Sequence, residues 1–534
     1  MLTSNNTCPS DKERRDVAYQ GEQMKIAMTG VTGNMGIQAL KELIKLPDAN
    51  FKLLVFEKEK RLKEIKKVCK GNLNRVQFVY GSLSNREACD KLVDGVDYVI
   101  NMAAVIPPHS DQHPEKAIEC NEKGADTLVS AIEALSKKPK LIHISTVALY
   151  GNRNSKHMWA RVGDPLLISP FDIYSLTKMR GEFRVLESDI PYKTVLRQTA
   201  MLHNHMLADN MNDGLMFHTC FNAPLEWVTA EDSGLLIANI IKEDVANEAK
   251  LKEKFWNRCF NIGGGLVNCV TGYDVLNDGF EIIGGSVKDF FDTNFNAIRN
   301  FHGVWFYDTD ELNDLFHHQR QSTADFWKQF KAEHGILKAG KIVSKRLIKK
   351  FAIQRLCKDP NSPHYWKNHN DEARMLAYFG GVDKFEAISK KWAEFSLLNE
   401  GKAENGDPID YAELKNRDTA PMVDLGYDPA KKVSLKDLAR IAEMHGGKLL
   451  SEEGGVYDRL EWENSDGERF AAKGYTVLCG HWWNPSYTSY CWDFDRLAQK
   501  DQIYAQIWYD SHDANEDNFY YLDDNFDAKY RKIK

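Results

Sequence analysis

The stretch MKIAMTGVTGNMG, residues 24–36, is a short apolar run that ends in a glycine-rich turn and leads into a helical pattern. Its glycines suit a nucleotide site. The first permits the tight turn, the second lets the backbone approach a pyrophosphate, and the third lets the helix pack on the strand. The N-terminus of that helix then faces the anion. The stretch therefore predicts dinucleotide binding, with cofactor contacts from Gly30, Thr32, Gly33, Asn34, Met35 and Gly36.

Further apolar runs follow this stretch at regular spacing, with helical segments such as residues 122–138 between them. The runs are LLVF (53–56), VQFVY (76–80), DYVINMAA (97–104), KLIHIST (140–146) and KTVLRQ (193–198). Apolar runs that alternate with helices are typical of a parallel sheet covered on both faces. The sequence thus predicts an α/β fold with a Rossmann-like, doubly wound parallel sheet.

The composition narrows the class of protein. The chain has 534 residues, 43% of them hydrophobic, and a net charge of -7, which indicates a globular protein and argues against nucleic-acid binding. None of its ten cysteines forms a C-x-x-C pair, so no metal site is expected. The polar first twenty residues lack a signal-peptide core, and no run reaches the ~20 apolar residues of a membrane span. A cytoplasmic protein is expected.

The pattern of predicted strands and helices changes along the chain and divides it into four predicted parts. Residues 1–22 form a flexible leader and residues 23–305 the cofactor-binding domain. Residues 306–405 carry Lys, Glu, His and Trp at helical spacing and predict a mostly helical region. Residues 406–534 form a small mixed C-terminal domain, in which Ser434 caps a helix that ends before Gly446.

Glu57 ends the second apolar run, where an acidic residue can bind the adenosine ribose 2′-hydroxyl. This position favours NAD. NADP is the alternative, because Lys58, Lys60 and Arg61 follow at once and suit a 2′-phosphate.

Tyr174 and Lys178 form a Y-x-x-x-K pair, which shares one face of a helix. A lysine ammonium beside a tyrosine favours the phenolate, so the pair can move a hydroxyl proton while hydride moves to nicotinamide. Ser145 and Thr146 end a predicted strand, at the edge where such sheets bind ligands.

The chain resembles the extended short-chain dehydrogenase/reductase family, also called the NAD-dependent epimerase/dehydratase family. The resemblance rests on five motifs in this order: the glycine turn, NMAA (101–104), Asn121 with Gly124, STVALYG (145–151) and YSLTK (174–178). The resemblance covers about residues 24–300. It implies that Tyr174 is the acid/base, that Lys178 also holds the nicotinamide ribose, and that Thr146 is the catalytic hydroxyl. It places Gly30, Gly33, Gly36 and Glu57 on cofactor positions, and further cofactor contacts at Ser82, Leu83, Ala103, Ala104 and Asn121.

The resemblance predicts an NAD(P)-dependent oxidoreductase that interconverts a secondary alcohol and a ketone of a small-molecule substrate. A nucleotide-sugar epimerase with tightly bound NAD and a non-catalytic cofactor-binding scaffold are the alternatives. Dehydration is disfavoured, because Val147 and Ala148 stand where the family's dehydratases carry an Asp-Glu pair. The family commonly forms dimers, so a homodimer is expected.

Two segments lie outside this resemblance. Residues 336–358 combine a basic face without acids and an apolar face, which suits either packing on the protein's own body, the favoured interpretation, or contact with a membrane surface. The tail, with GGKLLS (446–451) and CGHWWNP (479–485), faintly resembles a zinc ribbon that has lost most of its cysteines, and is expected to be metal-free.

Overall fold

The computed structural model describes residues 23–153, 157–206, 214–335, 341–398, 433–483, 493–518 and 520. The expected leader, residues 399–432 between the helical region and the tail, and the last two residues of CGHWWNP (479–485) lie outside these ranges. Within them, no helix is both long and apolar enough to cross a membrane.

The centre of the molecule is a seven-stranded parallel sheet in the order β10-β7-β5-β4-β1-β2-β3. Its strands are β1 (Met24–Thr29), β2 (Ala49–Val55), β3 (Val76–Tyr80), β4 (Tyr98–Asn101), β5 (Lys140–Thr146), β7 (Lys193–Gln198) and β10 (Arg258–Ile262). The strand order reverses between β1 and β4, as it does in doubly wound nucleotide-binding sheets. This confirms the predicted fold class.

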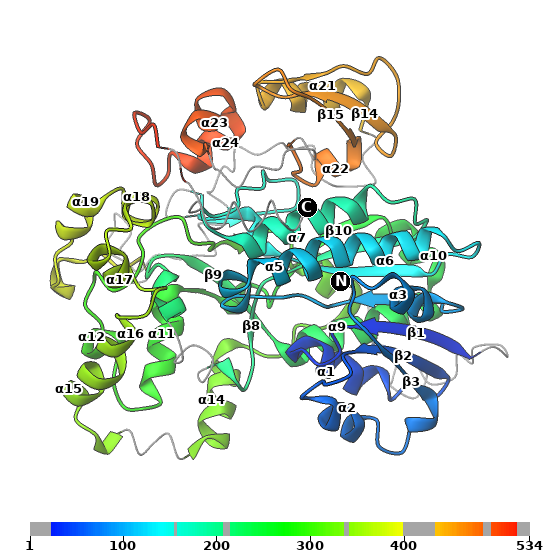
Figure 1. Ribbon diagram of the computed structural model, residues 1–534, viewed down its shortest axis with the longest axis horizontal. Coiled ribbons are helices and arrows are strands. Elements are labelled where there is room, and N and C mark those ends of the chain that lie inside the picture. Colours follow the sequence, from blue (N-terminus) through cyan, green and yellow to red (C-terminus); the bar gives the residue numbers. More distant parts are fainter. Residues whose placement is uncertain are drawn as a thin grey trace, which may run out of the picture.

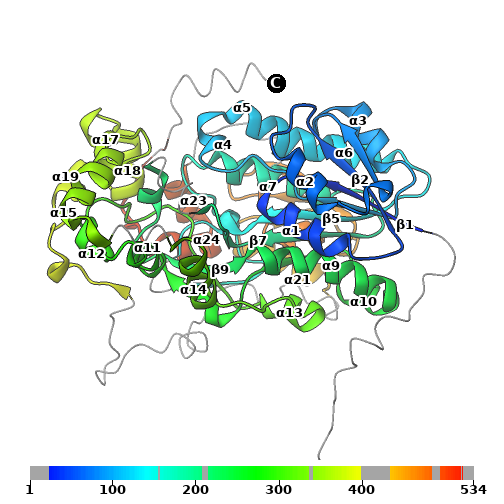
Figure 2. The same cartoon turned by 90° about the horizontal axis from the view of Figure 1, so that it is seen from below.

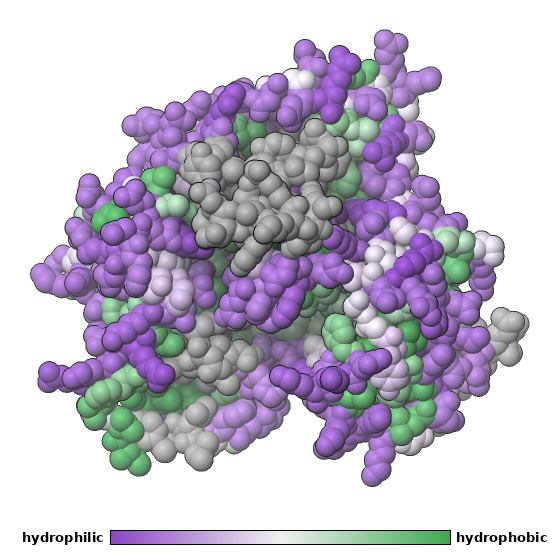
Figure 3. Space-filling view, in the orientation of Figure 1, coloured by the Kyte–Doolittle hydropathy of each residue, from purple (hydrophilic) through white to green (hydrophobic). Residues whose placement is uncertain are grey.

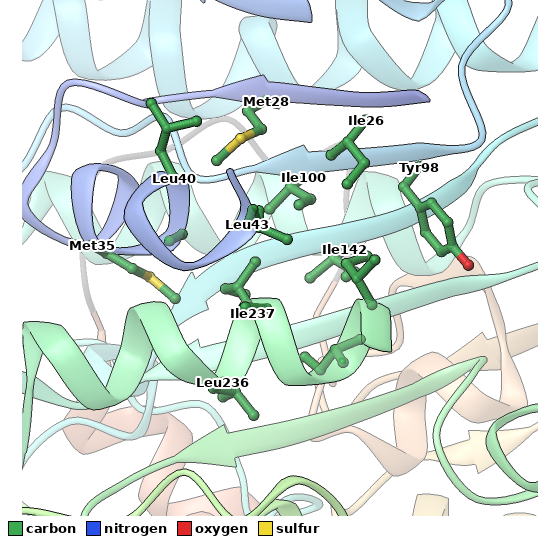
Figure 4. Packing of buried hydrophobic residues seen from close by; sticks show 14 of the residues in the cluster. Ile26, Met28, Met35, Leu40, Leu43, Tyr98, Ile100, Ile142, Leu236 and Ile237 are labelled. Atoms are coloured by element: carbon green, nitrogen blue, oxygen red, sulfur yellow. The ribbon is translucent and has the colours of Figure 1, made fainter. Parts of the chain in front are cut away.

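Helices cover both faces of the sheet (Figure 1). One face carries α1 (Asn34–Leu43), α9 (Ala230–Ala246) and α13 (Asp310–Phe316). The core under them is apolar, and Figure 4 shows Met35 of α1 and Ile237 of α9 on the facing sides of the two helices, while Leu40 points toward Met28 of β1. The other face carries α3 (Arg86–Val93), α6 (Gly124–Glu133) and α7 (Ile173–Leu186). Shorter helices flank the sheet at α2 (Leu62–Val68), α4 (His109–Gln112), α5 (Pro114–Ala117) and α10 (Glu248–Lys254).

Two small sheets extend beyond the carboxyl edge of the main sheet. One has the order β11-β9-β8, with β8 (Ala200–Leu202), β9 (Pro224–Thr229) and β11 (Cys269–Thr271). The other pairs β6 (Trp159–Ala160) with β12 (Trp305–Phe306).

The region after residue 305 is mostly helical, as the sequence predicts. It contains α14 (Thr323–Glu333), α15 (Lys345–Ile348), a π-helical turn at residues 349–353, α16 (Gln354–Leu356), α17 (Pro363–Asn368), α18 (Glu372–Phe379) and α19 (Val382–Glu386). These helices lie beside α11 (Gly272–Glu281) and α12 (Val287–Phe290), to the left of the sheet in Figure 1 and again in the turned view of Figure 2.

The tail packs on the body in two places. An antiparallel sheet of β13 (Lys448–Leu449), β14 (Arg459–Glu463) and β15 (Arg469–Lys473), with α21 (Leu435–Met444) and α22 (Gly474–Leu478), lies over α7 (Figure 1). Helices α23 (Phe494–Lys500) and α24 (Gln502–Trp508) share an apolar core with α17 and α18. Ser434 does cap α21, as the sequence predicts, and forms a full capping box with Asp437.

Candidate active site

The glycine turn joins β1 to α1 and is built so that a side chain would not fit. Gly30 has φ +64°, and a Cβ there would stand 2.5 Å from the backbone of Met102 and Ala103. A Cβ on Gly36 would stand 2.2 Å from the carbonyl oxygen of Gly30, so its absence lets α1 approach the turn. A Cβ on Gly33 would meet only the Gly30 oxygen, at 3.2 Å. The space in front of Gly33 is therefore open to an approaching group.

The side chains of the turn divide between core and surface. Met35 is buried and points into the core between α1 and α9, so only its backbone is available at the helix N-terminus (Figure 4). The carbonyl oxygen of Thr32 and the side-chain oxygen of Asn34 both accept hydrogen bonds from Arg61, at 2.7 and 3.3 Å.

Beyond β2, the acidic and the basic candidates for recognition of the adenosine ribose lie in different environments. Glu57 lies just past the strand, in an exposed turn, and makes no hydrogen bond to any described residue. Arg61 instead reaches back to the glycine turn and is held there by a two-point ion pair with Glu64, at 2.9 and 3.1 Å. Of the candidates Glu57, Lys58, Lys60 and Arg61, it is Arg61 that hydrogen bonds hold against the glycine turn.

A buried hydrogen-bond relay, which the sequence does not reveal, joins the carboxyl ends of β1 and β4 to the middle of β5. The Thr29 hydroxyl donates to Asn101 at 2.6 Å and accepts from the backbone N–H of Ala103 at 3.2 Å. The Asn101 amide in turn lies 3.0 Å from Nδ1 of His143 on β5. Burial, with Lys178 nearby, lowers the pKa of His143 to about 3, so its ring is neutral and Nδ1 accepts from Asn101. The relay sets the path of the chain through Ala103 and Ala104.

Asn121 holds the continuation of that path. It lies in a π-helical turn, residues 118–123, between α5 and α6. Its side chain accepts from the N–H of Val105 at 2.8 Å and donates to the Val105 carbonyl at 2.9 Å and to Thr177 of α7 at 3.1 Å. These bonds occupy the amide, so Asn121 braces the loop after β4 against the helix that carries Tyr174 and Lys178. Such π-helical turns are frequent at functional sites.

Ser82 and Leu83 lie in the loop after β3 and differ in environment. The Ser82 hydroxyl is half-buried and shares a 3.0 Å hydrogen bond with that of Ser84. Leu83 is buried, and a Cβ on Gly124 of α6 would stand only 3.0 Å from its side chain. Leu83 therefore packs the loop onto α6, whereas Ser82 stays accessible.

The structure brings Thr146, Tyr174 and Lys178 together. Thr146 ends β5, its hydroxyl accepts from the N–H of Ala148 at 3.2 Å, and the Tyr174 phenol lies beside it. Tyr174 and Lys178 lie one turn apart on α7, whose first turn is capped by Asp172. The Lys178 ammonium donates to the carbonyl oxygen of Ile144 at 2.6 Å, which holds it against the same strand end.

Burial shifts the pKa values of both groups. It raises the pKa of Tyr174 to about 12, although the neighbouring Thr146 hydroxyl opposes the rise. It lowers the pKa of Lys178 to about 8, against the attraction of Cys120 and Glu182. At neutral pH the pair therefore rests as a neutral phenol and a charged ammonium. Cys120, beside Lys178, is a neighbour that the sequence does not indicate.

A buried ion network supports α7 one turn beyond Lys178. Glu182 and Arg197 of β7 are both inaccessible to solvent and pair at 2.6 Å. Arg197 also donates to the Tyr150 hydroxyl at 2.6 Å and to the Cys479 carbonyl at 2.7 Å. From the tail, Nε2 of His481 lies 3.0 Å from the same Glu182 carboxylate. Helical spacing from Lys178 is a signal for Glu182, but nothing in the sequence places His481 beside that carboxylate.

All these groups meet at one edge of the main sheet. Gly30 follows β1, Ala103 follows β4 and Thr146 ends β5, and the strands are parallel. The predicted cofactor turn and the predicted proton-transfer group thus share the carboxyl edge, where doubly wound sheets bind ligands. No group of His, Cys, Asp and Glu side chains among the described residues is arranged to hold a metal ion.

Comparisons with known proteins find a family model that matches part of the chain. Residues 26–194 match the model of the NAD dependent epimerase/dehydratase family. The UDP-glucose 4-epimerases of Rickettsia felis and Rickettsia prowazekii are each 30% identical to this chain over 125 residues, which are 23% of this chain and 36% of theirs. The chain thus spans about a third of the length of the curated relatives it matches.

Matches to solved structures cover a larger share of the chain. A UDP-glucuronic acid 4-epimerase from Bacillus cereus, in complex with UDP-glucuronic acid and NAD, is 19% identical and covers 59% of this chain and 99% of its own, with a TM-score of 0.45. A dTDP-glucose 4,6-dehydratase from Streptomyces venezuelae is 17% identical and covers 60% of this chain and 100% of its own, also with a TM-score of 0.45.

Proposed function

We propose that this chain is an NAD-dependent enzyme that interconverts a secondary alcohol and the corresponding ketone, a proposal supported by the match of residues 26–194 to the model of the NAD dependent epimerase/dehydratase family. One observation carries the proposal. The Tyr174 phenol lies beside Thr146 at the end of β5, and the buried Lys178 ammonium, one helical turn further along α7, is bonded to Ile144 of the same strand.

The residues present fit a dinucleotide. The turn at Gly30 and Gly36 admits no side chain, and the space before Gly33 is open, as a pyrophosphate requires. The first turn of α1 holds no acidic residue that would repel an anion. Gly30, Thr32, Gly33, Asn34, Met35 and Gly36 would hold the pyrophosphate, Ala103 and Ala104 would line the cofactor, and Lys178 would bind its nicotinamide ribose.

Ribose recognition by Glu57 stays a prediction. Its carboxylate is exposed and free to turn toward a hydroxyl pair, whereas Arg61 is already engaged by Glu64 and the turn. We therefore favour NAD over NADP. Ser82, Leu83 and Asn121 would act on the cofactor less directly: Leu83 and Asn121 shape the loops after β3 and β4, and only Ser82 presents an accessible hydroxyl.

The proton chemistry falls to three side chains. When bound, NAD accepts or supplies the hydride. The neutral phenol of Tyr174 can donate its proton to a ketone oxygen, and the phenolate can take the proton of an alcohol. Thr146 can hold that oxygen in place by its hydroxyl. The Lys178 ammonium stabilises the phenolate by charge.

A nucleotide-sugar epimerase is the second candidate, and the matched relatives favour it, since they are UDP-glucose 4-epimerases. The same three side chains would serve, but the hydride would return to the substrate and no reduced cofactor would be released. A non-catalytic scaffold is the third candidate. Homodimer formation and the division of the chain near residues 305 and 405 stay predictions as well.

The test uses the full chain and Tyr174→Phe, which removes the phenol oxygen and keeps the ring. We expect NAD binding within about threefold of wild type and a loss of turnover of at least about a hundredfold, the usual scale for a general acid/base. Release of NADH with alcohol substrates supports the oxidoreductase, whereas UDP-sugar interconversion without release supports the epimerase. Unchanged turnover in Tyr174→Phe would contradict both.

A further inference from the structure

Exposed apolar side chains cluster in one short segment of the molecule. Among the large hydrophobic residues that stand exposed in the described ranges, four lie within residues 342–351: Ile342, Val343, Leu347 and Phe351. Ile342 is 89% and Phe351 66% exposed. Figure 3 shows apolar surface at the lower left of the molecule, where α15 lies in Figure 1. Both ribbon views place α15 at the periphery.

The same segment carries a concentration of positive charge. Between Lys341 and Lys358 the chain has seven basic and no acidic residues, although the whole protein has a net charge of -7. Arg346 and Lys350 are exposed and form no ion pair with any described residue. They alternate with Leu347 and Phe351 on one helical face, and the Lys350 ammonium lies 5.5 Å from the Phe351 ring.

The opposite face of the segment attaches it firmly to the body. Lys345 pairs with Asp289 at 2.8 Å and Lys349 pairs with Asp292 at 2.7 Å. Ile353 is fully buried in a core cluster with Phe295. The favoured expectation, packing on the protein's own domain, therefore describes this inner face. The outer face remains without a partner among the described residues.

From this arrangement we propose that the outer face of residues 341–351 binds an anionic membrane surface. Isolated apolar side chains between lysines and arginines suit the boundary of headgroups and acyl chains, where the rings and aliphatic ends insert and the cations meet lipid phosphates. A second copy of this chain is a poorer occupant, because its identical face would set cation against cation. The attachment is independent of the reaction at Tyr174.

Co-sedimentation of the full chain with vesicles tests the proposal. We expect it to pellet with vesicles of phosphatidylcholine and phosphatidylserine, to bind phosphatidylcholine alone about tenfold more weakly, and to be released by salt. Ile342→Ser/Phe351→Ser and Arg346→Gln/Lys350→Gln should each weaken binding about tenfold or more. Because all four side chains are exposed, folding should be unaffected, which far-ultraviolet circular dichroism and the melting temperature would verify.

Matched controls come from exposed sites elsewhere. Val267→Ser removes an apolar side chain that is 71% exposed, and Lys63→Gln/Lys67→Gln removes two exposed charges of α2. Both should bind vesicles like wild type. The proposal is overturned if the wild-type chain stays in the supernatant with anionic vesicles, or if Ile342→Ser/Phe351→Ser pellets unchanged. It is also overturned if that variant only loses self-association in sedimentation velocity.

Discussion

Substitution of Glu182 by Gln tests how far the tail and the candidate active site depend on one buried carboxylate. Glu182 accepts from Nε and Nη2 of Arg197, at 3.1 and 2.6 Å, and lies 3.0 Å from Nε2 of His481. In Glu182→Gln the shape is kept but the negative charge is lost. Arg197 then stays buried with neutral acceptors alone: the amide oxygen of the introduced Gln and the oxygens of Tyr150 and Cys479.

The size of the effect follows from that burial. Leaving one member of a buried ion pair without its counter-charge destabilises a protein by about 3–5 kcal/mol. Glu182 also raises the pKa of Lys178, so the lysine should lose its proton at lower pH in the variant. We therefore expect two linked results in Glu182→Gln: a lower free energy of unfolding and an activity that declines from a lower pH.

Urea unfolding at neutral pH measures the first result and a pH–rate profile the second. The matched control is Glu122→Gln, which also removes a glutamate bound to an arginine of α7. Glu122 is partly exposed and lies 3.4 Å from Arg180, so its loss should change the free energy of unfolding by no more than about 1 kcal/mol. If Glu182→Gln were also within about 1 kcal/mol of wild type, the reasoning from burial would be refuted.

The remaining predictions concern the glycine turn, the lysine and the tail. Gly30 and Gly95 share almost the same φ, +64° and +62°, but of these two only Gly30 has backbone atoms within 4 Å of an added Cβ. Gly95→Ala should therefore lose about 1–2 kcal/mol in the free energy of unfolding and still bind NAD. Gly30→Ala should lose NAD binding, and calorimetry would measure the binding of both variants. With wild-type protein, ketone reduction should fall as pH rises through about 8, because Lys178 loses its charge there; a flat profile from pH 7 to 9 would show that this charge is not needed. His481→Leu should lower the free energy of unfolding by about 1.5–3 kcal/mol, because the Glu182 carboxylate loses a hydrogen bond from Nε2 of His481. His481→Gln should retain most of that free energy, because its amide can still donate to the carboxylate. Equal losses in the two variants would exclude this hydrogen bond as the cause.

The fold could be predicted well because its signals are local. The apolar runs at residues 76–80, 140–146 and 193–198 coincide with β3, β5 and β7 to the residue. The run at 53–56 covers only the end of β2, which begins at Ala49, because Asn50 and Lys52 break the apolar pattern on an outer part of the sheet. The expected helix at residues 122–138 begins instead as the π-helical turn around Asn121 and ends at Glu133. A π-helical turn leaves no periodic signal in the sequence.

The candidate site could be predicted only where a motif carries it. The glycine spacing and the Tyr174–Lys178 pair are short-range patterns, and the structure assembles both at one sheet edge. The relay from Thr29 through Asn101 to His143 joins three strands that are far apart in sequence. Its members are ordinary strand residues, and only the parallel register brings them side by side.

The tail shows most clearly why residue type alone misleads. In the sequence His481 reads as a remnant ligand of a lost zinc ribbon, together with Cys479. In the structure the indole N–H of Trp483 donates to Nδ1 of His481 at 3.1 Å, so Nδ1 must accept and the ring proton lies on Nε2. That proton faces Glu182, 299 residues earlier in the chain. Both ring nitrogens are thereby engaged, and burial lowers the pKa of the ring, which keeps it neutral. The histidine serves as a fixed hydrogen-bond donor to the helix of Tyr174 and Lys178, and this role depends on the tail's position rather than on any motif within it.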